Sequence, residues 1–333
     1  MRQVIQYFSV AICLSLVLLN KGIAQDQPGV ADSIESAILK QKRFFRIAVP
    51  EGYDPNQQTK YDVLYVTDGN WNIKLTKQIQ DFLLEQGFMP QNIIVSVDHI
   101  SRDKDLTPTP GNNPSVFGGA DNFLSFLEKE LIPYINKKYS TTGTNTLFGH
   151  SYGGLFVTYA LLTNPKPFDF YIAADPSFWW DNRYMAKLAT DKLDPALHNN
   201  KALFITGRGG TQSEGMGIPS LDSVFKQKAP AGLRWKVVDY PGETHNSVKF
   251  KSIYDGLRFT YEGFNARFMV HPQKGIVMKG KPYKVWVLTE TDFPLRYTID
   301  GSEPTVQSEL AKPEITLSGS SVVTVKPFAT GKS

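Results

Sequence analysis

The residues with the clearest capacity for chemistry surround Ser151, in the run GHSYGG at positions 149–154. A short apolar segment, residues 146–148, precedes this run, and a helix-like stretch, LFVTYALL, follows it. A G-x-S-x-G pattern between a strand and a helix is typical of a sharp turn that presents a serine hydroxyl, with glycines keeping side chains out of the bend. The pattern predicts that Ser151 is a nucleophile, and an ordinary glycine-rich turn is the alternative.

A serine hydroxyl needs a base to become a nucleophile at neutral pH. Among the five histidines, His245 in the run PGETHNS follows the last predicted strand of the alternating region and precedes its terminal helix. This position satisfies the order serine, acid, histidine that accompanies such a turn. We therefore predict that His245 is the base. A histidine at a helix N-terminus without a role in catalysis is the alternative.

The other histidines fit this role less well. His150 adjoins the serine and should point away from the site, and His99 precedes the nucleophile in the chain. His198 lies in a polar loop, where we expect it to be solvated, and His271 belongs to the linker between two domains.

The acid that orients the base should follow the strand two beyond the serine, which is residues 202–206. Glu214, in the loop GRGGTQSEG, is the first candidate, and Asp222 is the second. Asp175, after the intervening strand, is the third, whereas Glu243 is too close to His245 to fold back onto it. Each of these carboxylates has a plain alternative as a solvated surface charge.

Acyl transfer also requires preorganised N–H donors for the oxyanion. The backbone N–H of Tyr152, directly after the nucleophile, is one candidate. The other is the N–H of Asn70, which a tight turn at Asp68-Gly69 would present; an ordinary turn is the alternative.

Aromatic residues gather around the predicted site. Trp71, Trp179 and Trp180 are candidates for binding a sugar ring or an aromatic acyl group, and we expect Tyr152 and Phe178 in the same pocket. Such side chains equally often fill a core.

These residues sit on an alternating pattern of strands and helices. Most strand candidates are continuous apolar runs, which is typical of parallel strands buried on both faces: residues 63–67, 93–97, 146–148, 170–174, 202–206 and 236–240. Two short strands with a turn near Gln41-Lys42 precede them. Helical periodicity covers residues 121–139 and the stretch after His245. We expect a three-layer α/β domain over residues 25–265 with a mostly parallel sheet.

The pattern changes beyond residue 265 to short β-rich segments separated by turns, with no helix pattern. It predicts a small all-β, Ig-like domain over residues 271–333. We expect about five strands where a sandwich commonly has about seven. Because the sequence ends just after a predicted strand, we expect this domain to be incomplete here.

The N-terminus has the pattern of a secretory signal peptide. Arg2 precedes an apolar run at residues 8–19, and Gly22 and Ala24 predict cleavage before Gln25. The run is shorter than the roughly 20 residues that span a bilayer, so we expect residues 1–24 to be removed and the mature protein to be periplasmic or secreted, without stable membrane insertion.

The mature chain has an ordinary composition. Of the 36 Lys and Arg residues, Arg2 and Lys21 fall in the signal segment, which leaves 34 against 32 acidic residues. No basic run with interleaved aromatics favours nucleic acid as a partner. The single cysteine, Cys13, lies in the signal segment, which excludes a disulfide, a thiolate metal site and a cysteine nucleophile from the mature protein.

Residues 34–263 resemble the putative-esterase family of α/β-hydrolases, which includes siderophore trilactone esterases, S-formylglutathione hydrolase, feruloyl esterases and mycolyltransferases. The motifs that carry the resemblance are YVTDGNWN, SRDKDLTPT, FLEKELIPYI, LFGHSYGG, DPSFWWDN and PGETHNS. The resemblance implies Ser151 as nucleophile, His245 as base, and Asn70 and Tyr152 as oxyanion donors, with the acid left open. The stretch YTIDGSEPTVQS and the residues after it resemble the C-terminal β domain of chitobiases and β-hexosaminidases, which favours a glycan-linked ester.

The leading hypothesis is therefore a serine carboxylesterase that forms an acyl-enzyme and needs no metal or organic cofactor. Its substrate would be a small-molecule or glycan ester: a carbohydrate-linked acetyl or feruloyl ester, or a siderophore. The alternatives are a prolyl-oligopeptidase-like serine peptidase and a catalytically silent hydrolase that binds glycans.

Overall fold

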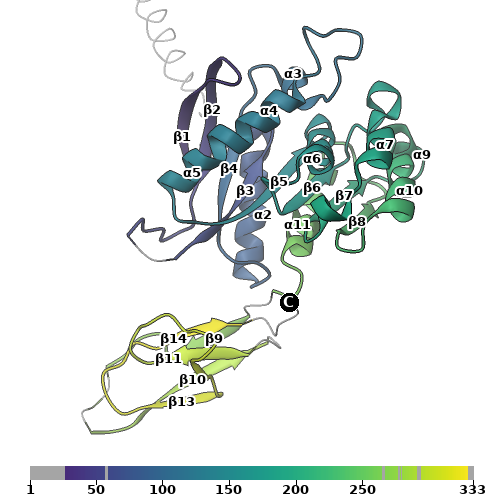
Figure 1. Ribbon diagram of the computed structural model, residues 1–333. Coiled ribbons are helices and arrows are strands. Elements are labelled where there is room, and N and C mark those ends of the chain that lie inside the picture. The colour runs from purple at the N-terminus through teal and green to yellow at the C-terminus, as the bar shows by residue number, and fades with distance from the viewer. Residues whose placement is uncertain are drawn as a thin grey trace, which may run out of the picture.

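The computed structural model describes residues 27–56, 59–264, 267–276, 278, 280–290 and 294–328. The predicted signal peptide, with Cys13, lies outside the described residues. The described chain consists of a large α/β part and a small β part that follows it (Figure 1).

The large part is built on one twisted sheet, whose strands lie in the order β1-β2-β4-β3-β5-β6-β7-β8. Every pair from β4 to β8 is parallel, and the hairpin β1–β2 adds two antiparallel strands at one edge. The strands are β1 (Val30–Ser36), β2 (Gln41–Ala48), β3 (Tyr61–Val66), β4 (Asn92–Val97), β5 (Thr141–His150), β6 (Phe170–Ala174), β7 (Ala202–Gly207) and β8 (Arg234–Asp239).

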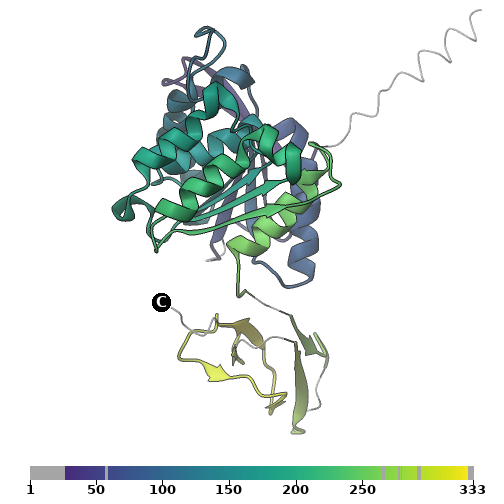
Figure 2. The ribbon, with the colours of Figure 1, turned by 90° about the vertical axis from the view of Figure 1, so that its right-hand side faces the viewer.

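Helices cover both faces of this sheet (Figure 2). On one face α2 (Gly69–Glu85) and α11 (Val248–Thr260) pack together and bury Ile73, Leu83 and Leu257 against the strands. The buried residues of the other helices form a second, larger cluster on the opposite face. Those elements are α3 (Arg102–Leu106), α4 (Ala120–Phe126), the π-helical turn η1 (Leu127–Leu131), α5 (Ile132–Lys138), α6 (Tyr152–Thr163), α7 (Trp180–Lys192), α8 (Pro195–His198), α9 (Gly210–Met216) and α10 (Ile218–Lys228).

The three-layer α/β architecture predicted from the alternating pattern is confirmed. Each of the six predicted strands of the sheet is present, and the predicted helix over residues 121–139 is the continuous series α4, η1 and α5. The N-terminal hairpin differs in position, because its turn covers residues 37–40 and not Gln41-Lys42. Val30 pairs with Ile47 and Ser36 with Gln41, so the polar run before Ser36 forms the edge strand.

The small β part contains two three-stranded sheets, β13-β10-β9 and β12-β11-β14. It has a core of its own, which includes Val285, Leu295 and Ile315. The first of its strands precedes the predicted start near His271, because β9 pairs with β10. The strands are β9 (Phe268–His271), β10 (Tyr283–Thr289), β11 (Leu295–Thr298), β12 (Glu309–Leu310), β13 (Glu314–Leu317) and β14 (Thr324–Pro327).

Among the described residues, no helix is both long enough and apolar enough to cross a membrane.

Candidate active site

Ser151 occupies a strained turn between β5 and α6. Its φ of 59° and ψ of −117° lie in a region that residues other than glycine rarely adopt. Hydrogen bonds hold the backbone on both sides of its Cα. Its N–H donates to the carbonyl of Ala174, and its carbonyl accepts from the N–H groups of Leu155 and Ser177. The turn therefore presents the hydroxyl in a fixed direction at the carboxyl edge of the sheet.

Glycines make this turn possible because three chain segments meet there. A Cβ on Gly149 would lie 2.3 Å from the backbone of Gly153, and a Cβ on Gly153 would lie 2.4 Å from Thr67 Oγ1. At Gly154 the nearest atom, on the loop after β6, would be 2.9 Å away. The predicted strand–turn–helix context of Ser151 is present.

Asp175 is the carboxylate that contacts His245. Its Oδ2 lies 2.6 Å from His245 Nδ1, and the carboxylate is fully buried. Asp175 directly follows β6, the neighbour of β5, and His150 pairs with Ala174 across these two strands. Ser151 and Asp175 therefore leave adjacent strands at the same edge.

The structure corrects the order of the acid candidates. Glu214 is exposed on α9, and Asp222 forms an ion pair with Lys226 at 2.6 Å. The strand on which the first prediction relied, β7, is instead followed by Arg208, whose Nε also lies 2.6 Å from Asp175 Oδ2. Nothing in the sequence indicates which of the two successive strands carries the carboxylate that meets His245.

His150 supports the loop of His245 and does not point away from the site as predicted. The two imidazole centroids are 4.4 Å apart, and His150 Nε2 lies 2.6 Å from the carbonyl oxygen of His245. Burial, followed by the nearby His245, lowers the pKa of His150 to about 3, so its ring is neutral and donates from Nε2. With Nδ1 of His245 held by Asp175, Nε2 is the ring nitrogen without a hydrogen bond to any described residue.

Ser177 is a further residue of the site that the sequence analysis missed. Its hydroxyl lies 3.2 Å from that of Ser151 and is 2% exposed. Ser177 stands two positions after Asp175 on the loop that follows β6. This one loop therefore supplies the hydrogen-bond partners of both Ser151 and His245. The only signal in the sequence was the position of the run DPS after a strand.

Of the two other histidines, His198 is not the solvated loop residue that the sequence predicted. His198 is fully buried, and its ring nitrogens lie 2.8 Å and 3.0 Å from the carbonyls of Asp194 and Leu161. His99 is buried between Asp68 and Asp105. The ring nitrogens of both histidines contact groups other than Ser151, in agreement with their exclusion as the base.

The N–H of Asn70 is not open to an oxyanion, which corrects its predicted role. It donates to Asp98 Oδ1 at 3.0 Å, because Gly69 already begins α2 and turns this N–H toward the end of β4. Tyr152 is the first residue of α6, where N–H groups have no acceptor within the helix. Its N–H therefore remains the candidate oxyanion donor.

The predicted aromatic binding residues separate into exposed and buried ones. Trp71 is 69% exposed and Trp179 is 45% exposed. Trp180 and Phe178 are buried, and Trp180 Nε1 donates to Thr109 Oγ1 at 2.8 Å. Trp180 thus belongs to the core, which corrects its assignment as a substrate-binding residue.

Arg102 joins the exposed aromatics to the turn of the nucleophile. Its guanidinium carbon lies 5.6 Å from the ring centroid of Trp71 and 5.4 Å from that of Tyr152. Nε and Nη2 form two hydrogen bonds to the buried Asp68, and Nη2 lies 3.4 Å from the carbonyl of His150. This network ties the end of β3 to the end of β5.

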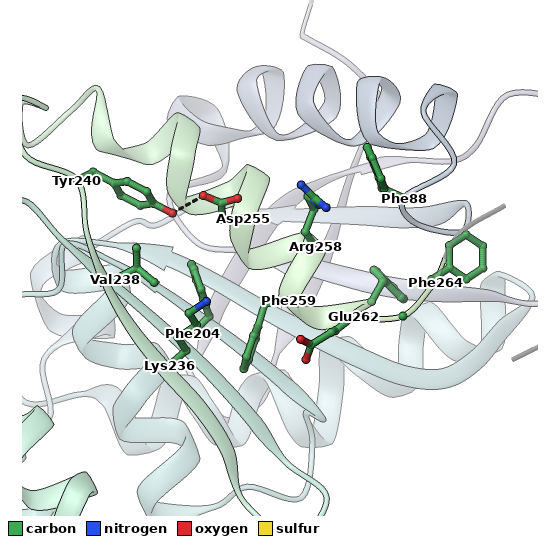
Figure 3. Close-up of a pocket in the computed structure, with 12 residues that line it drawn as sticks. Phe88, Phe204, Lys236, Val238, Tyr240, Asp255, Arg258, Phe259, Glu262 and Phe264 are labelled. Carbon is green, nitrogen blue, oxygen red and sulfur yellow. Dashed lines mark hydrogen bonds between the residues drawn. The ribbon is translucent and has the colours of Figure 1, made fainter. Parts of the chain in front are cut away.

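A separate cavity of about 360 Å³ opens beside the edge strand β8 (Figure 3). Lys236 lies on β8 and Tyr240 on the loop after it. Across the cavity they face Asp255 and Arg258 of α11, and Tyr240 donates a hydrogen bond to Asp255. Ser151 and His245 do not line this cavity. In the described part of the chain, no group of three or more His, Cys, Asp or Glu residues is placed to hold a metal ion.

Comparison with known proteins shows the family of this chain. Residues 36–254 match the model of the family described as putative esterase. The chain belongs to this family. The esterase is 31% identical to the solved IroE-like serine hydrolase from Shewanella oneidensis, with a TM-score of 0.62, and the match covers 70% of this chain and 80% of that one.

Two curated relatives match the esterase over most of their length. It is 34% identical over 237 residues to a siderophore triacetylfusarinine C esterase from Aspergillus fumigatus, covering 60% of this chain and 81% of that protein. It is 27% identical to the ferri-bacillibactin esterase of Bacillus subtilis, covering 66% and 85%. A siderophore enterobactin esterase from Emericella nidulans is 47% identical over 79 residues, and there the match covers only 26% of the relative. The chain is accordingly a serine hydrolase of esters.

Proposed function

We propose that the chain is an exported esterase that cleaves siderophore-type esters through an acyl-enzyme on Ser151, with His245 as base and Asp175 as acid. The observation that carries the proposal is the 2.6 Å contact of His245 with a fully buried carboxylate on the strand next to the nucleophile. A buried carboxylate held on Nδ1 fixes the tautomer and orientation that a base at Nε2 requires.

The proposed reaction has two steps. Ser151 Oγ attacks the ester carbonyl while His245 Nε2 takes its proton, and the N–H of Tyr152 donates to the oxyanion. Collapse of the tetrahedral intermediate expels the alcohol, which takes the proton from His245. Water then attacks the acyl-enzyme by the same route, releasing the acid and restoring the serine. Asp175 holds the ring and stabilises the imidazolium in both steps.

The substrate class rests on the relatives and on the surface beside Ser151. The names of the relatives describe esterases of enterobactin, triacetylfusarinine C and bacillibactin. The exposed Trp71 and Trp179, with the half-buried Arg102 and Tyr152, form an aromatic and cationic rim, which suits planar or anionic groups. Lys249 adds a half-buried ammonium, and its Nζ lies 3.5 Å from Asn72 Oδ1. Burial lowers the pKa of this lysine.

A carbohydrate-linked acetyl or feruloyl ester is the second candidate. The exposed rings of Trp71 and Trp179 favour it, because flat aromatic faces also bind sugar rings. Export, to the periplasm or outside the cell, is proposed from the N-terminal pattern alone, and the purified mature protein should begin at Gln25.

A fluorophosphonate and a substrate panel test the proposal together. Wild type should label at Ser151, and Ser151→Ala should lose label and at least about a thousandfold in turnover with the fold intact. Glu214→Gln is the matched control for an acid candidate and should stay within twofold of wild type. A trilactone siderophore should be cleaved faster than acetylated xylan, methyl ferulate or a dipeptidyl anilide. Labelling at another residue would overturn the mechanism, and a faster xylan or anilide reaction would overturn the substrate class.

A further inference from the structure

The buried carboxylate of Asp175 depends on only two donors among the described residues. His245 Nδ1 and Arg208 Nε each lie 2.6 Å from the same oxygen, Oδ2. The other oxygen, Oδ1, is buried and has no hydrogen-bond partner. A carboxylate bound through one oxygen can rotate about its terminal bond unless its donors fix it, so each of the two donors has a large share in its orientation.

Arg208 is itself held firmly in place. It follows β7 directly, and Ala174 pairs with Thr206, so Asp175 and Arg208 leave neighbouring parallel strands at the same edge. The backbone N–H of Arg208 donates to Ser213 Oγ at 3.1 Å, and its Nη1 donates to Gln212 Oε1 at 2.9 Å.

The loop that carries Arg208 is closed by a second set of hydrogen bonds. Ser213 Oγ donates to Asp239 Oδ1 at 2.7 Å, and the N–H of Gly209 also reaches this carboxylate at 3.1 Å. Gly209 has a φ of 77°, which glycine adopts without strain. These contacts join the ends of β7 and β8, so the loop can aim a guanidinium with little freedom.

We propose that Arg208 is a positioning residue of this esterase, which acts through Asp175 to hold His245 in the orientation needed for proton transfer. The inference rests on the proposed function. The guanidinium compensates a fully buried negative charge and leaves Oδ2 facing the imidazole. Without it, the carboxylate has one donor left and a free oxygen toward which it can turn.

A double-mutant cycle separates this role from a general structural one. Arg208→Met should lower kcat at least tenfold with KM within about twofold, because the proposed role of Arg208 is to orient Asp175 and not to bind substrate. Asp175→Asn should lower kcat roughly a thousandfold. In the Asp175→Asn background, Arg208→Met should change kcat less than twofold, because the group through which it acts is already lost. Losses that multiply in the double variant, or an unchanged kcat in Arg208→Met, would overturn the proposal.

Companion variants keep the test decisive if Arg208→Met folds poorly. Arg208→Lys keeps a charged donor within reach of Oδ2, so its kcat should lie closer to wild type than that of the Met variant, and its cycle with Asp175→Asn can replace the first. The double variant removes both buried charges and should be stable where the single one is not. Arg183→Met, which removes an exposed arginine bound to Ser220, is the matched control and should leave kcat unchanged.

A spectroscopic signature gives a readout that stability alone would not move. The far-downfield proton resonance of His245 Nδ1–H reports its hydrogen bond to Asp175; it should shift or broaden in Arg208→Met and persist in Arg183→Met. The two proposals fail in different ways. If Ser151→Ala and Asp175→Asn retain activity, the proposed function is wrong; if they lose it while Arg208→Met does not, only the role of Arg208 is wrong.

Discussion

His150 illustrates how a single buried side chain serves a site without taking part in its chemistry. It stands next to the nucleophile in the chain, and its ring lies against the imidazole of His245 and binds the carbonyl of that residue. A charged imidazolium there would be desolvated and would repel the imidazolium proposed to form on His245 during the reaction. The low pKa of His150, about 3, keeps its ring neutral, so it does not repel a positive charge on His245.

This neutral histidine makes the stability of the fold dependent on pH. The pKa of His150 falls from an ordinary 6.5 in the unfolded chain to about 3 in the fold, so its contribution is complete above pH 6.5. Below pH 6.5 the unfolded chain takes up a proton that the folded chain refuses, and stability falls by up to about 1.4 kcal/mol per pH unit as pH drops toward 3.

The prediction is checked with His150→Gln, which keeps an N–H donor for the carbonyl of His245 and cannot titrate. Between pH 6.5 and 4.5 the free energy of unfolding of wild type, measured in urea, should fall about 2 kcal/mol further than that of the variant. Equal slopes for the two proteins would show that His150 is protonated in the fold. Lys236→Gln, in the separate cavity beside β8, should follow the wild-type slope.

At the residue scale, sequence patterns point to groups with a local signature. Ser151 lies in a motif, and His245 has the right place in the chain order. Asp175, Arg208 and Ser177 have no such signature, because their roles arise from which loops meet at the edge of the sheet. A carboxylate after one strand and an arginine after the next look alike as surface charges until the register of the strands places them together.

At the scale of elements, the turn after β5 combines strain with close packing. The Cβ that Gly149→Ala adds would lie 2.3 Å from the backbone of Gly153, and backbone cannot rotate away as a flexible side chain can. We expect this variant to lose at least about 2 kcal/mol of stability and most of its ester hydrolysis, because α6 or Ser151 must shift.

Gly215 of α9 offers the matched control for this change. Nothing lies within 4 Å of the position of its added Cβ, and its φ is not positive. Gly215→Ala should therefore be neutral or stabilise by up to about 1 kcal/mol, because alanine favours a helix. Thermal unfolding and a nitrophenyl ester assay of both variants decide the matter. An active, stable Gly149→Ala would mean that the turn is looser than these contacts require.

Elements with a strong periodic pattern were predicted well, and those decided by pairing were not. The buried strands and α11 appear where continuous apolar runs or helical spacing placed them. The edge strand β1 has the polar sequence VADSIES, so only its hydrogen bonds to β2 reveal it. β12 is two residues long and is likewise defined by its partner, β11.

The molecule as a whole is divided by its cores. The clusters on the two faces of the large sheet contain no residue of the β part, whose core is separate. The change from alternating helices and strands to short strands near residue 265 revealed this division in the sequence. The resemblance of the β part to the C-terminal domain of chitobiases stays a prediction, as does the role that it would have with glycans.

Separate cores predict that the large part functions without the small one. A chain that ends at Phe264 keeps every proposed catalytic and positioning residue, and loses the contact of the Arg267 guanidinium with the ring of Phe88, 5.4 Å apart. An exposed contact of this kind is worth about 1 kcal/mol, and residues of both parts also line one pocket, so the unfolding temperature should fall by less than about 10 °C. Hydrolysis of a nitrophenyl ester should stay within twofold of wild type, because the proposed triad and Arg208 are all anchored at the carboxyl edge of β5 to β8. A tenfold loss, or an unfolding temperature lowered by tens of degrees, would show instead that the β part completes the fold or the site of the esterase.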